Sequence, residues 1–284
     1  MKKAVSIITV SVIIAGGTGF AKIIASDSFS SGNVSGDYTD KKPLGDPVNA
    51  RVLEGVTGFK NNTWGLSASG TITIRKGKGL THDAVQGRAA DGYLQIIPPV
   101  QNEGAAISRK TRRVLSPALT GPVFYMSGLI NIGSLRHLNI GEKVAMGVSD
   151  AAQLGWDGVN GIFIGAIKDD SGDVFYAVFA GENTYKLGAA VTAEQAFETQ
   201  MLIVRWEAGS ARQGGVLTAW VVAQNDKTAT QILNIENVSA GRISDYKSVI
   251  VQVHGGLNKT YSTGIKMDEF RLGSEWNDVT SASK

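Results

Sequence analysis

The sequence predicts an all-β protein, a jelly-roll β-sandwich of two antiparallel sheets with one short helix. Three observations predict this fold. Short apolar runs recur along the chain, polar or glycine-containing turns separate them, and glycine is abundant, at 35 of 284 residues. Apolar residues make up 43% and charged residues 19%, which is enough to build a core and too apolar for a disordered chain.

The predicted strands begin near the N-terminus and close the chain near its C-terminus. SDSFS (26–30) is a short first strand, and the Gly-, Ser- and Asp-rich stretch from there to about residue 62 is predicted to be a long surface loop. KDDSGD (168–173) and AGSARQGG (208–215) each join two strands into a hairpin. The remaining strands are TITIR (71–75), GYLQIIP (92–98), PVFYMSGLINI (122–132), GIFIGAI (161–167), VFYAVFA (174–180), MLIVRWE (201–207), VLTAWVV (216–222), SVIVQVH (248–254) and GIKMDEFRLG (264–273).

The one predicted helix is TAEQAFETQ (192–200). Thr192 is followed three residues later by Gln195, which is the spacing of a capping box.

The N-terminus has the pattern of a secretory signal peptide. MKK is followed by the apolar run AVSIITVSVIIA (4–15) and then by small residues, which predicts a signal over residues 1–25 with cleavage after Ala21 or Ala25. Residues 26–280 then form a single domain and 281–284 a short tail. The apolar run is shorter than the ~20 residues that span a bilayer, so we expect no stable membrane span after cleavage. The mature protein is expected to be secreted or in the cell envelope, either periplasmic or extracellular.

Composition excludes several classes of function. Loss of Lys2 and Lys3 with the signal lowers the formal net charge from +3 to +1, so the overall charge gives no support for nucleic-acid binding. Without any cysteine the chain cannot carry thiol catalysis or Cys-ligated metals. The three histidines, His82, His137 and His254, have no metal-ligand spacing, so no cofactor is expected.

Two acids stand side by side in the closing strand. Successive side chains of a strand point to opposite faces, so Asp268 and Glu269 are not expected to act as a catalytic pair. Regular alternation places Met267, Glu269 and Arg271 on one face. It places Asp268, Phe270 and Leu272 on the other face. Phe270 and Leu272 are expected in the core.

Alternation along four strands gives a candidate ligand-binding face. The apolar residues at every second position are expected to face the core, which leaves the residues between them on the outer side. If the four strands share one sheet, the outer side presents aromatic, amide and basic groups suited to a saccharide. These are Tyr125, Asn131, Arg205, Trp220, Gln252 and His254. The alternative is that the strands lie in different sheets, or that the face is only hydrated.

Two charged clusters have a structural and a functional interpretation. Asp169, Asp170 and Asp173 are turn residues, with calcium binding as the alternative. The basic run is interpreted as a solvated loop before a strand, and an anionic-glycan patch is the alternative. It consists of Arg109, Lys110, Arg112 and Arg113.

Several segments together resemble a known family. These are DSFS, GFKNNTWG (58–65), VFYMSGLIN, QMLIVRWE, VLTAWV and above all IKMDEFRLGSEWNDV (265–279). They resemble LamG-like domains, which are concanavalin A-like lectin/glucanase sandwiches, of the type in secreted and envelope proteins of planctomycete- and verrucomicrobia-like bacteria. The resemblance implies a carbohydrate-binding or envelope/matrix protein, and a possible partner that is a polysaccharide or glycoconjugate. A purely structural extracellular module is a further alternative.

Whether the chain is an enzyme stays open, with a non-catalytic role favoured. The E-x-D-x-x-E motif of related glucanases does not occur in the sequence. Gln252 and His254 match the Q-[IV]-H strand of jelly-roll alginate lyases, in which Gln and His contact the uronate carboxylate and the C5 proton. The other two lyase motifs are not matched: SRKTRR (108–113) lacks the acid, and LNKTYSTG (257–264) has Lys and Tyr in another order. A polysaccharide lyase acting on uronate polymers is the catalytic alternative.

Overall fold

The computed structural model describes a large part of the chain, from residue 11 to residue 280. The described residues are 11–12, 23–27, 29, 56–57, 59, 64, 72–76, 78–83, 92–97, 107–116, 119–150, 161–209, 214–226, 229–255 and 264–280. Most of the predicted signal peptide, most of the predicted loop up to residue 62 and the predicted tail 281–284 lie outside these residues.

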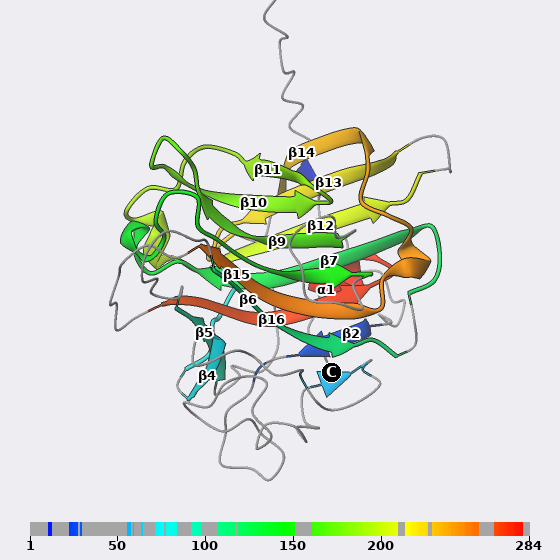
Figure 1. The fold of residues 1–284 in the computed structure, drawn as a ribbon, viewed down its shortest axis with the longest axis horizontal. Coiled ribbons are helices and arrows are strands. Elements are labelled where there is room, and N and C mark those ends of the chain that lie inside the picture. The colour runs from blue at the N-terminus through cyan, green and yellow to red at the C-terminus, as the bar shows by residue number, and fades with distance from the viewer. Residues whose placement is uncertain are drawn as a thin grey trace, which may run out of the picture.

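Two antiparallel sheets lie face to face, as predicted (Figure 1). The ten-stranded sheet has the order β1-β14-β13-β12-β7-β16-β2-β3, with β5 beside β16 and β4 beside β5. Its strands are β1 (Ser11–Val12), β2 (Ile23–Asp27), β3 (Val56–Thr57), β4 (Ile72–Lys76), β5 (Gly92–Ile96), β7 (Val123–Asn131), β12 (Gln200–Glu207), β13 (Gly215–Val222), β14 (Ala229–Val238) and β16 (Ile265–Gly273).

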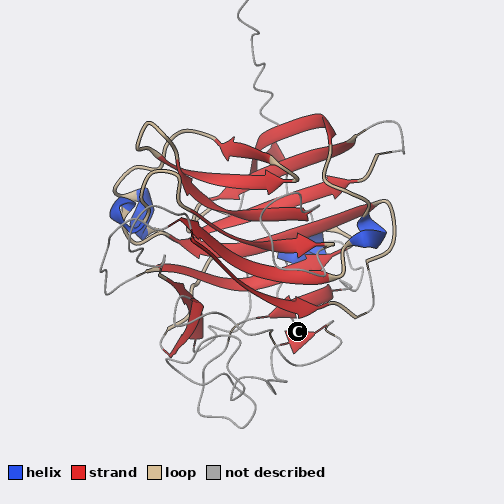
Figure 2. Cartoon of the chain, viewed as in Figure 1, coloured by secondary structure: helices blue, strands red, loops and turns tan. Residues whose placement is uncertain are grey.

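The six-stranded sheet has the order β11-β10-β9-β8-β15-β6. Its strands are β6 (Ile107–Val114), β8 (Lys143–Ser149), β9 (Gly161–Lys168), β10 (Val174–Ala180), β11 (Asn183–Leu187) and β15 (Ser248–Gly255). Three 3₁₀ turns lie at the margins of the sheets (Figure 2): η2 (Leu135–His137), η3 (Gln195–Phe197) and η4 (Ile243–Asp245). The α-helix α1 (Trp276–Thr280) lies on the outer side of the ten-stranded sheet, where Val279 packs against Leu129 and Ile203.

The core lies between the sheets and follows the predicted alternation. Phe124 and Met126 of β7, Leu202 of β12, Leu217 of β13 and Val251 of β15 are all buried in it. Both predicted hairpins form, β9 with β10 and β12 with β13. The closing strand β16 lies between β7 and the first strand β2, with Phe270 opposite Asp27. The alternation of apolar residues therefore correctly predicted which face of each of these strands lies in the core between the sheets.

Three local predictions are wrong. The strand predicted at SDSFS (26–30) is β2, Ile23–Asp27, which begins three residues earlier and places Ala25 in the core. TAEQAFETQ forms only the 3₁₀ turn η3; the capping-box contacts between Thr192 and Gln195 are present, but the turn ends at Phe197. The basic run 109–113 belongs to strand β6 and is not a solvated loop.

A β-bulge in β16 breaks the alternation predicted for the closing strand. The register with β7 shifts between Asp268, opposite Leu129, and Arg271, opposite Ser127. Glu269 takes a φ of 50°, in the left-handed region that non-glycine residues seldom adopt. Met267 therefore faces the core together with Phe270 and Leu272, because the extra residue reverses the alternation. The predicted division of this strand into two faces is wrong.

Candidate functional site

The six predicted ligand-binding residues do not form one face. Tyr125, Asn131, Arg205 and Trp220 belong to the ten-stranded sheet, whereas Gln252 and His254 belong to β15 of the six-stranded sheet. In both sheets these side chains occupy the positions between core residues. The two groups thus lie on opposite outer sides of the sandwich, because the alternation was predicted correctly and the sheet membership was not.

The four residues on the ten-stranded sheet make contacts within the protein. Trp220 is 6% exposed and its ring lies edge-on to Trp276 of α1, with centroids 4.9 Å apart, and Tyr125 meets the same indole at 6.2 Å. Asn131 Nδ2 donates to the carbonyl of Phe197 at 2.8 Å, and Arg205 pairs with Glu207 at 2.6 Å. A sugar ring could reach the indole of Trp220 only after α1 had moved.

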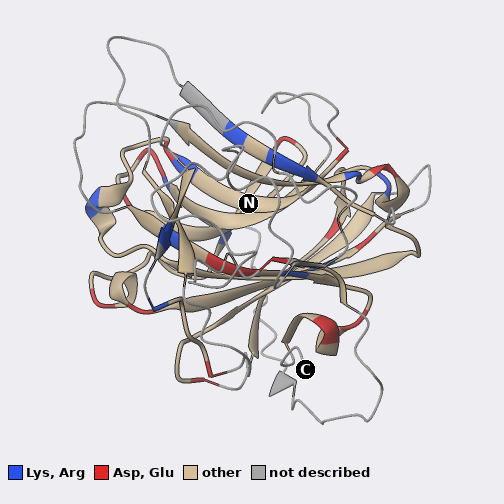
Figure 3. Ribbon diagram, turned by 90° about the horizontal axis from the view of Figure 1, so that it is seen from below, with Lys and Arg blue, Asp and Glu red and all other residues tan. Residues whose placement is uncertain are grey.

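The outer side of the six-stranded sheet brings Gln252 and His254 beside basic residues that the sequence analysis did not link to them. Gln252 lies opposite Lys110 of β6 and Ala145 of β8, and His254 lies opposite Lys143 of β8. Arg112 lies opposite Ile250, which is two residues before Gln252 in β15 and on the same side of the sheet. Directly opposed residues point to the same side of a sheet. We call the set Lys110, Arg112, Lys143, Gln252 and His254 the basic strip. In the view of Figure 3 the six-stranded sheet is the upper layer, and Lys and Arg segments, drawn in blue, lie along it.

Burial separates the basic strip into an inner and an outer part. Lys110 is 7% and Gln252 2% exposed, whereas Arg112, Lys143 and His254 are half-buried. Gln252 Nε2 is buried and has no hydrogen-bond partner among the described residues. A buried amide donor without an acceptor costs about 1–3 kcal/mol, and such groups in native proteins call for an explanation. An acceptor supplied by a ligand is one explanation.

The strands that carry the basic strip contain no acid. The sequences of β6, β8 and β15, ISRKTRRV, KVAMGVS and SVIVQVHG, include several cations and neither Asp nor Glu. Beside them lies an outer apolar cluster of Ala145, Phe163, Ala177, Phe179 and Ile250. The Lys143 ammonium lies 5.6 Å from the centroid of the Phe179 ring, within the range of a cation–π contact. The side therefore combines positive charge, amide donors and aromatic surface.

Of the three aspartates in the 168–173 turn, Asp169 stabilises the hairpin. Asp169 Oδ1 accepts the backbone N–H groups of Ser171 and Asp173, both at 3.0 Å, and Oδ2 accepts Lys186 Nζ. The Lys186 hydrogen bond is the main cause that lowers the pKa of Asp169 below its ordinary value. Among the described residues no three His, Asp or Glu side chains group in a way that could hold a metal ion. His82 and His137 each bond a backbone carbonyl, of Val222 and Ile132 respectively.

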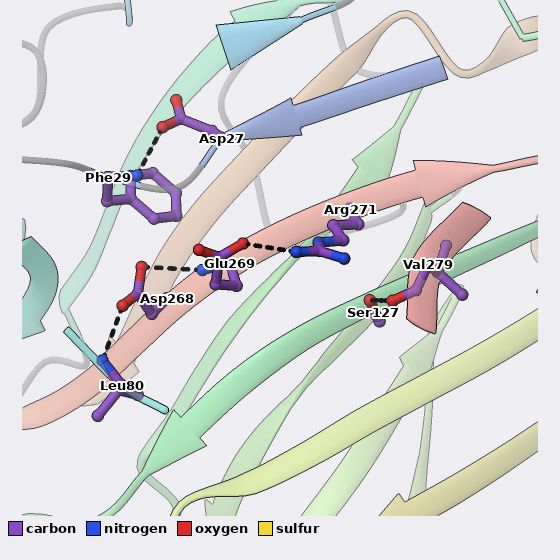
Figure 4. Close-up of polar contacts among 8 residues, drawn as sticks. All are labelled: Asp27, Phe29, Leu80, Ser127, Asp268, Glu269, Arg271 and Val279. Atoms are coloured by element: carbon purple, nitrogen blue, oxygen red, sulfur yellow. Dashed lines mark hydrogen bonds and ion pairs between the residues drawn. The ribbon is translucent and has the colours of Figure 1, made fainter. Parts of the chain in front are cut away.

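Three carboxylates meet where β16 lies beside β2 (Figure 4). Asp268 accepts the backbone N–H of Leu80 and that of Glu269, each at 2.9 Å. Glu269 accepts Arg271 Nη2 at 3.1 Å. Asp27 binds Arg113 Nη1 of the opposite sheet at 3.1 Å, in addition to the N–H groups of Phe29 and Trp64. With the bulge in place, the charge of Glu269 acts on Asp268, an interaction that regular alternation did not predict.

Burial of these acids raises their pKa values. Desolvation and then the charge of Glu269 raise the pKa of the fully buried Asp268 well above its ordinary value. Desolvation also raises the pKa of Glu269, against the opposing effect of Arg271. Asp268 is fully enclosed, so the pair has no access to a substrate and its role is structural.

Glu269→Gln should become more stable relative to the wild type as the pH rises. A carboxyl whose pKa is raised by folding binds its proton more tightly in the folded state, so its contribution is present below the unfolded pKa of about 4.3 and is lost as pH rises through the folded pKa. Glutamine does not titrate, so the variant does not lose this stability as the pH rises. Urea unfolding of both proteins at several pH values between 4 and 8 measures the difference. The variant Glu207→Gln, in the more exposed pair with Arg205, is the control. A difference that stays constant with pH would contradict the raised pKa.

Comparison with known proteins supports the fold and leaves the family open. A scan against protein-family models finds no match, and neither does a search of curated proteins. Among solved structures, the chain is similar to the marine PL-14 alginate lyase from Aplysia kurodai, with a TM-score of 0.50 and 10% identity over 90% of this chain and 100% of that one. It is also similar to a legume lectin-like domain from Entamoeba histolytica, with a TM-score of 0.43 and 13% identity over 65% and 85%. The chain has a jelly-roll β-sandwich fold of two antiparallel sheets. At these identities the likeness concerns the fold alone.

Proposed function

We propose that this protein binds an acidic polysaccharide through the basic strip on the six-stranded sheet. The observation that carries the proposal is the buried Nε2 of Gln252, which has no hydrogen-bond partner among the described residues and lies on the strand position directly opposite the buried Lys110. An amide N–H and an ammonium group on adjacent strands suit the carboxylate of a uronate residue, which accepts hydrogen bonds from both.

The surrounding residues support the same ligand class. Arg112, Lys143 and His254 extend the donors along the side, so that successive acidic sugars of a polymer would meet successive cations. The outer apolar cluster is itself buried and packs beside the basic strip, so the charged and amide groups carry the recognition. Neighbouring cations without an acid on their strands favour an anion over a neutral sugar.

A polysaccharide lyase is the second candidate function. The observation that favours it is that Gln252 and His254, two residues apart in β15, share one side with Lys110 and Lys143. In a lyase reaction the Lys110 ammonium and the Gln252 amide would bind the uronate carboxylate, and His254 would take the C5 proton. The electron pair would form the C4–C5 double bond as the C4–O bond breaks, and the leaving oxygen would take a proton from solvent. The fold is also that of a protein named as an alginate lyase. A rise in ultraviolet absorbance on uronate polymers, abolished in His254→Ala, would establish this activity.

The proposed setting is outside the cytoplasm, as a non-catalytic protein of the cell envelope or matrix. The signal-peptide pattern supports export, and the described residues include no helix that is long and apolar enough to cross a membrane. Cleavage at either position removes β1. Cleavage after Ala25 would also remove the first three residues of β2, among them the fully buried Ala25, which pairs with Leu272, so cleavage after Ala21 keeps more of the sheet.

N-terminal sequencing of the exported protein should therefore begin at Lys22. A start at Ser26 would contradict this boundary and would imply that β2 is not needed in full.

Retention on immobilised polysaccharides tests the proposed function. The protein beginning at Lys22 should be retained on alginate and pectate more strongly than on the neutral glucans dextran and laminarin. The retention should weaken as salt rises from 50 to 500 mM, because salt screens partly exposed charges. Equal retention on neutral and acidic polymers would contradict the proposal. Retention on none of them would leave a purely structural module as the better account.

A further inference from the structure

We propose that the outer side of the ten-stranded sheet holds a second binding site, for a neutral saccharide, which the helix α1 covers. Tyr125 of β7, Trp220 of β13 and Trp276 of α1 form this aromatic site. The three rings meet edge to face, with Trp276 between the other two. The site is independent of the basic strip, which lies on the other outer side of the sandwich.

The indole N–H groups are the observation that points to a ligand. Trp220 is 94% buried, as its 6% exposure implies, and its Nε1 has no hydrogen-bond partner among the described residues. Trp276 Nε1 is likewise buried without a partner there. The two donors come from two different elements and belong to one aromatic cluster, and each is costly to leave unpaired. A ligand that offers oxygen acceptors and an apolar face satisfies both groups.

The charged groups near the aromatic site are engaged within the protein, which favours a neutral ligand. Arg271 pairs with Glu269 at 3.1 Å. The Asp278 carboxylate accepts two backbone N–H groups, of Ser274 and Glu275, at 2.8 Å each. Neither charge is left for an anion or a cation. Sugar hydroxyl and ring oxygens are the acceptors that remain.

A hydrogen bond and apolar contacts hold the helix α1 on the sheet that it covers. Ser127 Oγ donates to the carbonyl of Val279 at 2.8 Å, which joins α1 to β7. Otherwise Val279 is held by the apolar cluster beneath it, which includes Leu80, Leu129 and Ile203. Figure 3 shows α1 outside the lower layer. A small outward shift of α1 would expose the indole of Trp220. Trp276 would move with the helix and would then contact the ligand from the side opposite Trp220.

Calorimetric titration with cellohexaose, a neutral oligosaccharide, tests this site. Wild-type protein is expected to bind it with an affinity that does not change between 50 and 500 mM salt. Trp220→Phe and Trp276→Phe keep an aromatic ring and remove the N–H donor, so each should weaken binding about tenfold. Ser127→Ala frees Val279 and should strengthen binding several-fold, because less is lost when α1 moves.

Two controls separate this site from the rest of the molecule. Trp206→Phe removes another buried, unpartnered indole N–H, but from the core between the sheets, and should leave the affinity unchanged. Lys110→Ala, in the basic strip, should also leave it unchanged, so failure of one site does not imply failure of the other. Absence of cellohexaose binding, or equal affinity in Trp220→Phe, Trp276→Phe and wild type, would overturn the proposal.

Discussion

Replacing Asp27 by alanine is expected to lower the free energy of unfolding by about 3–5 kcal/mol. Asp27 and Arg113 are 1% and 0% exposed and join the two sheets through one ion pair. Removing the carboxylate leaves the Arg113 guanidinium buried beside the Phe59 ring, 4.6 Å from its centroid, without its counter-ion. It also removes the acceptor of the Phe29 and Trp64 N–H groups. Urea unfolding monitored by tryptophan fluorescence measures the loss.

An exposed ion pair of the same chemistry is the control. Arg205 and Glu207 are 27% and 44% exposed, so Glu207→Ala should cost no more than about 1 kcal/mol. The double variant Asp27→Ala/Arg113→Leu should recover part of the loss, because it removes the unpaired charge as well. A loss below 1 kcal/mol for Asp27→Ala would mean that the pair does not hold the sheets together.

Lys110→Ala is expected to weaken binding of an acidic polysaccharide by at least tenfold. A hydrogen bond to a charged group contributes about 1.5–3 kcal/mol, and each 1.4 kcal/mol is a factor of ten in affinity. Arg205→Ala removes a cation from the other outer side and serves as the matched control. Equal losses in both variants would show that the whole protein's charge, and not the basic strip, binds the polymer.

Gln252→Leu separates binding from stability. The substitution keeps the approximate volume of the side chain and removes an amide whose Nε2 is buried without a partner among the described residues. The free protein should therefore be equally or more stable, while its affinity for the polysaccharide falls. A variant that loses stability instead would show that Gln252 has a structural role, and would remove the main support for the site.

The sequence predicted the faces of the strands better than their partners. Phe124, Leu202, Leu217 and Val251 could be placed in the core because alternation is a local property of each strand. The joining of Trp220 and His254 into one face failed because sheet order depends on contacts between distant segments, here β15 between β6 and β8. The strand β14 (ATQILNIENV) was not predicted, since its polar residues hide the apolar period.

The bulge at Glu269 could not be predicted from the closing strand alone. Alternation assumes a regular strand, and nothing in MDEFRL marks the residue with a φ of 50°. The role of Lys110 was missed for a related reason. SRKTRR (108–113) has no apolar alternation and was therefore predicted to be a loop, although it pairs with Val249–His254 of β15. Its position beside Gln252 becomes visible only in the folded sheet.

The most direct test of the proposed function is the affinity of the protein beginning at Lys22 for oligouronates, compared between wild type, Lys110→Ala and Gln252→Leu. Titration calorimetry with an alginate hexasaccharide at 100 mM salt should show binding in the wild type. Both variants should bind at least tenfold more weakly, while Arg205→Ala keeps the wild-type affinity. Unchanged affinity in Lys110→Ala and Gln252→Leu, or no binding by any of the four proteins, would contradict a saccharide site on the six-stranded sheet.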